Sequence, residues 1–426
     1  MKPMLVRGGR VIDPSRDLDE IADVVVRDGR VAAVGRGLGA PDGAEIVDAT
    51  GLVVAPGLVD VHTHLREPGQ EDRETIATGA AAAVAGGFTA ICAMPNTDPP
   101  IDNQSAVGFV VKQGAAAGAA RVFPIGAISM GQRGEQLAEF GEMVGAGAVA
   151  VSDDGHPVAS GQLMRTALEY ARTFGIPVAD HCEEPTLAAG GVMHEGIVST
   201  RLGLKGIPAA AEEIMVARDV LLAGHTGGHV HLCHMSTRGS VALIRHAKDR
   251  HVPVTAEVCP HHYALTHEAC GDYDTNAKMN PPLRELEDVE AIREGLRDGT
   301  IDLIATDHAP HHYDAKEREF DDAPFGIVGL ETALGLGLTV LVAGGVLTLG
   351  ALIARMSTIP ARTFGLPGGT LATGRPADLI IIDPEVRWRV DPQRFRSKSR
   401  NTPFAGWELQ GAVVRTVVGG RTVFLR

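Results

Sequence analysis

The chain has 426 residues, 44% of them hydrophobic and 22% charged, and its 53 acidic against 39 basic residues give a net charge of −14. This composition is typical of globular proteins and argues against a disordered chain. An acidic chain without a Lys/Arg-rich block is also a poor candidate for binding nucleic acid.

Both ends of the chain predict short β-strands. Residues 1–55 alternate apolar and polar residues around Gly-containing turns, as in LVRGGRVI (5–12). Residues 367–426 have the same pattern, as in DLIIID (378–383). We therefore predict one small β-sandwich domain built from both termini, residues 1–55 together with 367–426.

The middle of the chain, residues 56–366, alternates short apolar runs with Ala-rich helical runs. The eight candidate strands are 58–64, 88–94, 121–127, 148–154, 176–182, 229–234, 253–259 and 302–308. Helical candidates between them include 74–87, 161–175, 212–224 and 288–299. This order predicts an α/β fold, a (β/α)₈ TIM barrel. A doubly wound open sheet is the alternative, and the lack of G-x-G-x-x-G after the first strand disfavours its dinucleotide-binding form.

The stretch from Thr332 to Ala354 has no charged residue and is long enough to span a bilayer. Gly344-Gly345 interrupts it, and Thr348 is placed to cap a new helix. We predict two buried helices here rather than a membrane span. The N-terminus also lacks the apolar core of a signal peptide, and five scattered cysteines favour a reducing cytoplasm.

Five predicted strands end in side chains that can bind a metal. These are His62 and His64, Asp153 and Asp154, His181, His234, and Asp307. Each lies at the carboxyl end of its strand, where barrel enzymes place their chemistry. Imidazole and carboxylate donors without a thiolate cluster suit catalytic zinc, and their number predicts two ions that share a carboxylate.

Several motifs in this order resemble the class I, bacterial-type dihydroorotases of the amidohydrolase superfamily. They are DVHTHLREPGQEDRETI (60–76), MPNTDPP (94–100), SDDG (152–155), HCEE (181–184), HMSTRGS (234–240), EVCPHHYALT (257–266), KMNPPLR (278–284) and ATDHAPH (305–311). The resemblance covers essentially the whole chain. It implies ring closure of N-carbamoyl-L-aspartate to L-dihydroorotate in pyrimidine synthesis, by a zinc-activated water.

The resemblance also assigns roles to residues. The six zinc ligands would be His62, His64, Asp154, His181, His234 and Asp307. Asp154 would bridge the two ions, Asp153 would be structural, and Asp307 would also be the catalytic acid and base. The substrate would contact His64, Arg66, Asn96, Asn280, His311, Phe325 and Gly326. Among these, Arg66, Asn96 and His311 would hold the substrate carboxylate.

The sequence leaves two other functions to consider, a different cyclic-amide hydrolase and a non-catalytic protein. Hydantoinases, dihydropyrimidinases and allantoinases bridge their metals with a carboxylated Lys on strand four, but this chain has no Lys between Lys112 and Lys205. A non-catalytic scaffold for aspartate transcarbamoylase is disfavoured because all six ligands are present.

The resemblance also implies a homo-oligomer and association with aspartate transcarbamoylase. Cys182 is either a further zinc ligand or a buried filler, and the charged segment 312–324 is a solvated loop or a lid.

Overall fold

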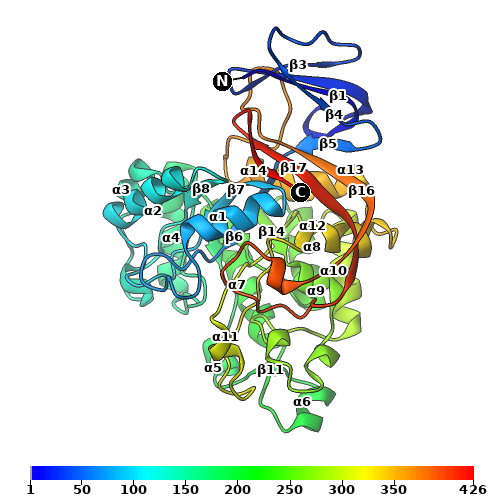
Figure 1. Cartoon of the computed structure of the whole chain (residues 1–426). Helices are drawn as coiled ribbons and strands as arrows, with labels where there is room; N and C mark the ends of the chain where they lie inside the picture. Colours follow the sequence, from blue (N-terminus) through cyan, green and yellow to red (C-terminus); the bar gives the residue numbers. More distant parts are fainter. Residues whose placement is uncertain (1) are drawn as a thin grey trace.

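The computed structural model describes residues 2–426, and strands from both ends of the chain form one sheet. Its eight strands are ordered β18-β17-β16-β5-β1-β2-β3, with β4 paired to β1. They are β1 (Met4–Asp13), β2 (Leu18–Arg27), β3 (Arg30–Gly35), β4 (Glu45–Asp48), β5 (Val53–Pro56), β16 (Leu379–Arg389), β17 (Glu408–Val418) and β18 (Arg421–Leu425). In Figure 1 the blue strands lie at one end of the molecule, and the orange and red strands extend from them along the side of the barrel.

The two faces of strand β16 pack against different cores. Leu379 and Ile381 belong to the apolar cluster inside the terminal sheet, whereas Ile380 and Ile382 belong to the main cluster that includes Phe88 of the barrel. Successive side chains of a strand point to opposite faces, so one apolar run can serve both cores. The terminal sheet is therefore fixed to the barrel by buried side chains.

Eight parallel strands form the barrel, one for each predicted strand. They are β6 (Leu58–Thr63), β7 (Phe88–Ala93), β8 (Arg121–Pro124), β9 (Val151–Ser152), β10 (Val178–Asp180), β13 (Val230–Leu232), β14 (Val254–Val258) and β15 (Leu303–Ile304). Two sheets, β6-β7-β8 and β15-β14-β13-β10-β9, are joined by parallel bridges between Gly126 and Val151 and between Thr63 and His308. These bridges close the ring, which confirms the barrel and excludes the open sheet.

Helices follow the strands around the barrel. The main ones are α1 (Ile76–Ala85), α2 (Gln104–Ala117), α3 (Phe140–Ala146), α4 (Gly161–Phe174), α7 (Ala210–Thr226), α8 (Arg238–Asp249), α10 (Leu286–Asp298) and α14 (Ile359–Thr363). Side chains of Asn103, Ser160 and Thr237 cap α2, α4 and α8 by accepting backbone N–H groups. Such caps satisfy donors that a helix start leaves free, which helps to fix where each helix begins.

The uncharged stretch 332–354 forms two helical segments, as predicted. The first comprises α12 (Ala333–Leu336) and a π-helical turn (Gly337–Val342), and the second begins with α13 (Leu349–Ile353). The hydroxyl of Thr348 accepts the amide of Ala351 at 3.1 Å and so caps α13. Among residues 2–426, no helix is both long and apolar enough to cross a membrane.

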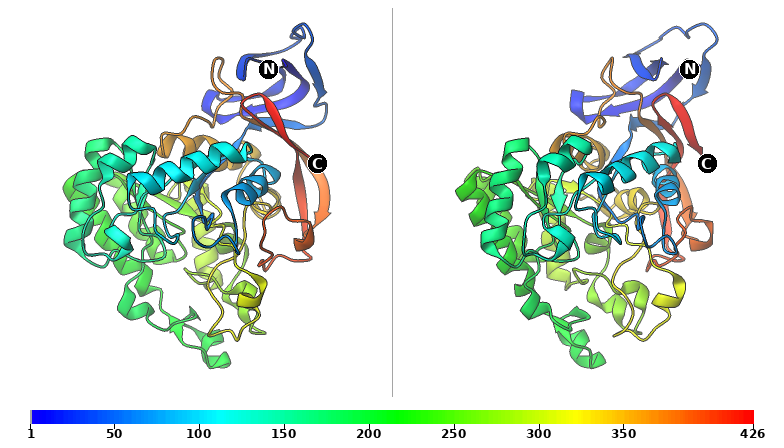
Figure 2. Two further views of the ribbon diagram at one scale, coloured as in Figure 1. Left: turned by 60° about the vertical axis from the view of Figure 1, so that its left-hand side comes forward. Right: turned by 90° about the vertical axis from the view of Figure 1, so that its left-hand side faces the viewer.

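Shorter elements project from the barrel on the side away from the terminal sheet (Figures 1 and 2). They are α5 (Pro185–Ala188), β11 (Met193–His194), α6 (Ile197–Leu202), β12 (Gly206–Ile207) and α11 (Tyr313–Lys316), whereas α9 (Pro260–Ala264) packs against α10 and α12. The prediction of a solvated segment over 312–324 is wrong at Lys316 and Phe320, which are buried. The Lys316 amine donates to the carbonyl oxygens of Lys278, Pro324 and Gly326, which explains how a charged residue can be buried there.

The predicted domain limits can be placed on these elements. The limit at residue 55 falls within β5, and the limit at residue 367 falls in the connection between α14 and β16. We retain the division into a barrel (56–366) and a composite sheet domain as a proposal.

Candidate metal centre

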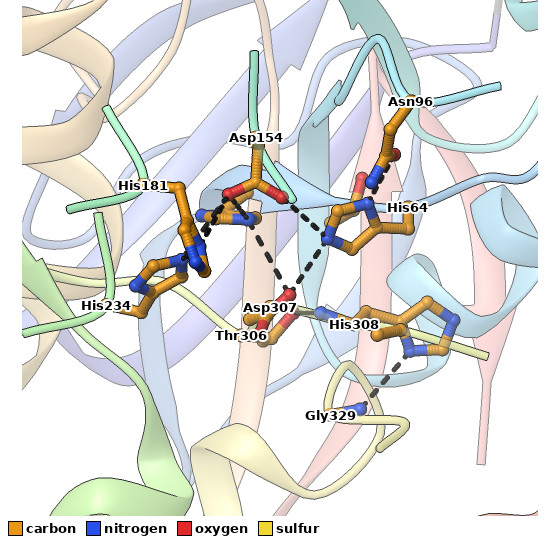
Figure 3. A network of polar contacts seen from close by, with 12 residues as sticks. His64, Asn96, Asp154, His181, His234, Thr306, Asp307, His308 and Gly329 are labelled. Carbon is orange, nitrogen blue, oxygen red and sulfur yellow. Dashed lines mark hydrogen bonds and ion pairs between the residues drawn. The ribbon is translucent and has the colours of Figure 1, made fainter. Parts of the chain in front are cut away.

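The predicted metal-binding side chains converge at one end of the barrel (Figure 3). His62 lies on β6, and the others follow the last residues of their strands by one to three positions: His64, Asp154, His181, His234 and Asp307. All six are buried. Because parallel strands of a closed barrel end at the same rim, residues distant in sequence meet there.

His62, His64 and Asp307 form the first group of potential ligands. The Oδ1 atom of Asp307 lies 3.0 Å from His64 Nε2 and 3.6 Å from His62 Nε2. The two histidines are separated by two positions, so a strand directs them to the same face. The three side chains can therefore present donors to one ion.

Asp154, His181 and His234 form the second group. His234 Nε2 lies 3.3 Å from Asp154 Oδ1 and 3.0 Å from His181 Nδ1. Asp154 also reaches the first group, with its Oδ1 3.4 Å from His62 Nε2 and its Oδ2 3.4 Å from His64 Nε2. One carboxylate thus contacts all four histidines and occupies a bridging position.

Two neighbouring side chains orient the histidines of the first group. His62 Nδ1 donates to Glu257 Oε1 at 2.6 Å, and His64 Nδ1 donates to the side-chain oxygen of Asn96 at 2.8 Å. Each contact directs the Nε2 atom into the centre, which is the arrangement typical of metal-binding histidines. Asn96 was predicted to bind substrate, and in this structure its side chain contacts His64.

The pKa values of the central groups are shifted by their mutual contacts. Burial alone would raise the pKa of Asp154, but the charge of His62 and hydrogen bonds from His181 and His234 hold it well below its usual range. For His181, burial would lower the pKa, yet contacts with Asp154 and Glu183 raise it to about 10. A raised pKa means that the His181 imidazole holds its second proton tightly. A cation that binds between Asp154 and His181 would displace this proton.

The donors fit a divalent metal. His62 Nε2 is buried, lies 3.4 Å from Asp154 Oδ1 and 3.6 Å from Asp307 Oδ1, and has no hydrogen-bond partner within residues 2–426. Buried polar atoms are normally satisfied, so this unpartnered nitrogen beside two carboxylates suits a metal ligand. Four imidazoles with two carboxylates, in two groups that share Asp154, are a donor set suited to zinc.

Three residues of this rim adopt left-handed backbone conformations. Arg66, His234 and Asp307 have φ values of 62°, 38° and 48°. Non-glycine residues rarely adopt positive φ, and such strain concentrates at functional sites because the surrounding structure must enforce it. At these positions the backbone conformation serves to aim the side chains.

The side chains predicted to hold a carboxylate lie beside His64. Arg66 Nε donates to the carbonyl of Pro310 at 3.2 Å, and its Nη2 lies 3.4 Å from His311 Nε2. Arg66 is buried, and it makes no ion pair with any carboxylate of residues 2–426. Burial lowers the pKa of Arg66 to about 10, and the nearby Arg73 adds to this effect.

Of the remaining predicted contacts, Asn280 and Phe325 line a cavity of about 580 Å³ together with Glu183, whereas Gly326 is not among its lining residues. Asn280 donates to Glu183 Oε2 at 2.8 Å, and its buried carbonyl oxygen has no partner among the described residues. The carbonyl of Phe325 accepts from His311, while the carbonyl of Gly326 accepts from Asn401 and Lys316. Asn280 therefore offers a free acceptor, whereas these two backbone carbonyls are already bonded.

Comparison with known proteins decides the family. Residues 51–240 match a family model described as dihydro-orotase-like, and residues 252–424 match one described as the amidohydrolase family. A protein named dihydroorotase from Geobacter metallireducens is 53% identical over 423 residues, or 99% of this chain and 100% of the relative. Another from Pelotomaculum thermopropionicum is 57% identical over 420 residues, or 99% and 98% of the two chains. The chain belongs to the dihydroorotase family.

Solved structures of cyclic-amide hydrolases share the fold of this family member. An L-hydantoinase (dihydropyrimidinase) from Arthrobacter aurescens has a TM-score of 0.88 at 28% identity and covers 99% of this chain and 96% of its own. A D-hydantoinase from Thermus sp. has a TM-score of 0.82 at 25% identity, with 99% and 96% covered. The fold alone therefore does not select the substrate, and the site must do so.

Three residues of the site escaped the sequence analysis. Glu257, which bonds both His62 and His231, is a carboxylate within the buried strand β14, and that placement was an available signal. Asn401 comes from the segment between β16 and β17 and bonds His311, Ala309 and Gly326. Cys233, rather than Cys182, lies with His62 and Asp154, since the Cys182 sulfur contacts Asp180 and Asp219 instead.

Asp153 faces away from the centre. Its Oδ1 accepts the amides of Ile128 and Ser129 at 2.8 and 3.1 Å, which ties the loop after β8 to the end of β9. His261 and His262 are buried beside Cys259 as a separate group, and His262 Nε2 donates to the carbonyl of Pro281. Neither histidine joins the two groups at the centre.

Proposed function

We propose that this family member catalyses the reversible closure of N-carbamoyl-L-aspartate to L-dihydroorotate and water. The observation that carries the proposal is a bridged cluster of six potential ligands with a buried, unpaired arginine at its rim. Relatives named dihydroorotase align over essentially the full length, which supports the same chemistry.

We assign two zinc ions to the cluster. His62, His64 and Asp307 would hold one, His181 and His234 would hold the other, and Asp154 would contact both. Bound zinc supplies Lewis acidity towards a carbonyl oxygen and lowers the pKa of water to about 7. Glu257 and Asn96 would keep the imidazoles of His62 and His64 in the tautomer that binds metal.

Asp307 is assigned the proton transfers. In ring closure, the ureido nitrogen forms a bond to the side-chain carboxyl carbon and loses a proton, and one oxygen of that carboxyl group leaves as water after taking up this proton and a second one from solvent. In ring opening, the same nitrogen must regain its proton. Contacts with His64 and His62 overcome the effect of burial and hold the pKa of Asp307 below its usual range, so it is ionised and able to accept a proton.

Arg66 is assigned to the carboxylate that remains on the ring. A buried guanidinium without an anionic partner is unfavourable, and a bound carboxylate would supply two charge-assisted hydrogen bonds. Hydantoin, allantoin and dihydrouracil lack this carboxylate. The unpaired charge of Arg66 therefore favours dihydroorotate over the other cyclic amides.

A substrate panel tests the proposal. Zinc-loaded enzyme is assayed with L-dihydroorotate, hydantoin, allantoin and dihydrouracil, and Arg66→Gln is compared with Arg165→Gln on the outer surface of α4. We expect turnover of dihydroorotate alone, and a fall in its kcat/KM of about 100-fold in Arg66→Gln, since charge-assisted hydrogen bonds are worth ~1.5–3 kcal/mol each. Preferential turnover of a ring without a carboxylate would overturn the assignment.

We also propose a homo-oligomer, association with aspartate transcarbamoylase and a cytoplasmic location. Ile214 and Leu221 of α7 are 50% and 72% exposed and lie seven positions apart on one helix face, which supports a protein contact there. All five cysteines are buried and free, which supports a reducing compartment. Light scattering of the chain, of Leu221→Glu, and of a mixture with the transcarbamoylase tests both assemblies, and an unaltered monomer in all three would exclude them.

A further inference from the structure

A second hollow lies between the terminal sheet and the barrel, away from the metal centre. Its volume is about 820 Å³, and Trp388, Phe395 and Phe424 contribute to its walls. The hollow is bounded by β16, β18, the end of α1, α12, and the turn η7 (Pro392–Arg394). None of the six potential metal ligands lines it. Its volume lies within the range of small-molecule sites, about 300–1,000 Å³.

Four arginines line this hollow: Arg389, Arg394, Arg396 and Arg426. None of the four forms an ion pair within residues 2–426. The chain has 53 acidic residues and a net charge of −14, so a group of unpaired arginines is unexpected by composition. The hollow is therefore a local concentration of positive charge on an acidic protein.

The two side-chain carboxylates in the lining, Glu331 and Asp391, accept hydrogen bonds from backbone amides. Glu331 accepts the backbone amides of Arg396 and Ser397, and Asp391 accepts the amide of Gln393. Neither forms an ion pair within residues 2–426, and four guanidinium groups against two side-chain carboxylates leave the lining with an excess of positive charge. Burial lowers the pKa of Arg426, and the like charge of Arg394 adds to this effect, whereas the carboxylate of Asp383 opposes it.

Aromatic groups accompany these charges. Trp388 is held by a hydrogen bond from its Nε1 to the carbonyl of Gly411 at 3.0 Å, and the guanidinium carbon of Arg426 lies 5.3 Å from the centre of its ring. A rigid indole and a planar guanidinium both offer surfaces on which a flat ring can stack. Phe424 adds a half-buried aromatic ring to the same wall.

We propose that this hollow binds a phosphorylated small molecule that carries a planar ring, of the nucleotide class. Arginine forks match phosphate oxygens in a bidentate manner, and none of these four forms an ion pair within residues 2–426. The aromatic wall gives the ring a place to stack, which an inorganic anion would not use. The site is separate from the metal centre and does not depend on the reaction proposed for it.

Calorimetric titration of the zinc-loaded full chain with UMP, AMP and ribose 5-phosphate tests this site. We expect one nucleotide to bind per chain, and ribose 5-phosphate to bind at least about tenfold more weakly, since stacking of a base is worth ~1–3 kcal/mol. Binding should weaken about tenfold or more in Arg394→Gln/Arg426→Gln because charge-assisted contacts are lost. The matched variant Arg16→Gln, an exposed and unpaired arginine outside the hollow, should bind as the wild type does.

Two further comparisons separate this site from the metal centre. Nucleotide affinity should be unchanged in Arg66→Gln and in the presence of saturating L-dihydroorotate. Loss of binding in Arg66→Gln would place the nucleotide at the metal centre and overturn the proposal. Equal affinity in wild type and the double variant, or no saturable binding at millimolar nucleotide, would overturn it as well.

Discussion

The metal centre and the terminal sheet bury opposite kinds of side chain. At the barrel rim, four imidazoles and two carboxylates are buried against one another, and His62 Nε2 has no hydrogen-bond partner among residues 2–426. In the sheet, a cluster that includes Val6, Val54 and Ile381 is buried without polar partners. The sheet cluster stabilises the fold by removing apolar surface from water, whereas the rim accepts unfavourable burial in order to bind an ion. Changes in the two regions should therefore separate activity from stability.

The largest effect on activity is expected for Asp307→Asn. The amide cannot take up a proton and is a poorer ligand, so kcat should fall by about 10⁴-fold, at the upper end of the range for general acid–base groups. The unfolding midpoint should fall modestly, because Asn keeps the volume of Asp307 but loses its charge pairing with His62 and His64. Steady-state assays and thermal unfolding measure both, with the surface variant Asp298→Asn as the control. Near-normal turnover in Asp307→Asn would remove this residue from the proton transfers.

A smaller loss is expected for Glu257→Gln. The pKa of Glu257 falls to about 2 because the charge and hydrogen bonds of His62 and His231 outweigh burial, so the carboxylate is ionised at every pH at which the enzyme works. Without it, His62 is a weaker and less ordered ligand, and zinc affinity should fall about 10- to 100-fold. Competition with a chelator measures the affinity, and activity should return when zinc is added in excess. Failure of excess zinc to restore activity would point to a role beyond holding His62.

Asn401 should have a moderate effect, because it acts through other groups. Its amide nitrogen donates to the carbonyls of Ala309 and Gly326, and its oxygen accepts the amide of His311. Asn401→Asp keeps the acceptor and loses both donors, so KM for dihydroorotate should rise about tenfold, as expected for two lost hydrogen bonds. Zinc content should be unchanged in this variant. A change in zinc content with KM unaffected would contradict the positioning role.

The smallest effect on activity is expected in the terminal sheet. Ile381→Ala removes a buried side chain from the sheet cluster and should lower the free energy of unfolding by about 2–4 kcal/mol. Below the unfolding transition, kcat/KM for dihydroorotate should remain within about twofold of wild type, since the cluster does not contact the rim. Glu385→Ala, an exposed position on the same strand, should change neither quantity. A large loss of kcat/KM in folded Ile381→Ala would show that the sheet and the rim are coupled.

Local patterns were sufficient to predict the barrel and much of the rim. Apolar runs of strand length gave all eight barrel strands, and the residues just after them gave His181, His234 and Asp307. The Thr348 cap was also predictable, because capping is decided by residues within one turn of the helix.

Contacts between distant segments were beyond such patterns. Asn401 meets His311 across 90 positions, and Glu257 meets His62 across 195. Lys316 was expected in solvent because its neighbours are charged, but three carbonyls from two segments enclose its amine. No periodicity in the surrounding residues encodes these contacts, since the barrel's tertiary packing creates them.

Zinc stoichiometry of the metal-reconstituted chain tests the bridged centre most directly. Elemental analysis is made on wild type and on His181→Asn, with dihydroorotate turnover measured on the same samples. Two tightly bound zinc ions per chain in wild type, falling to one in His181→Asn together with turnover, would agree with two groups of ligands that share Asp154. A single ion in both proteins, with turnover of dihydroorotate retained in His181→Asn, would contradict it.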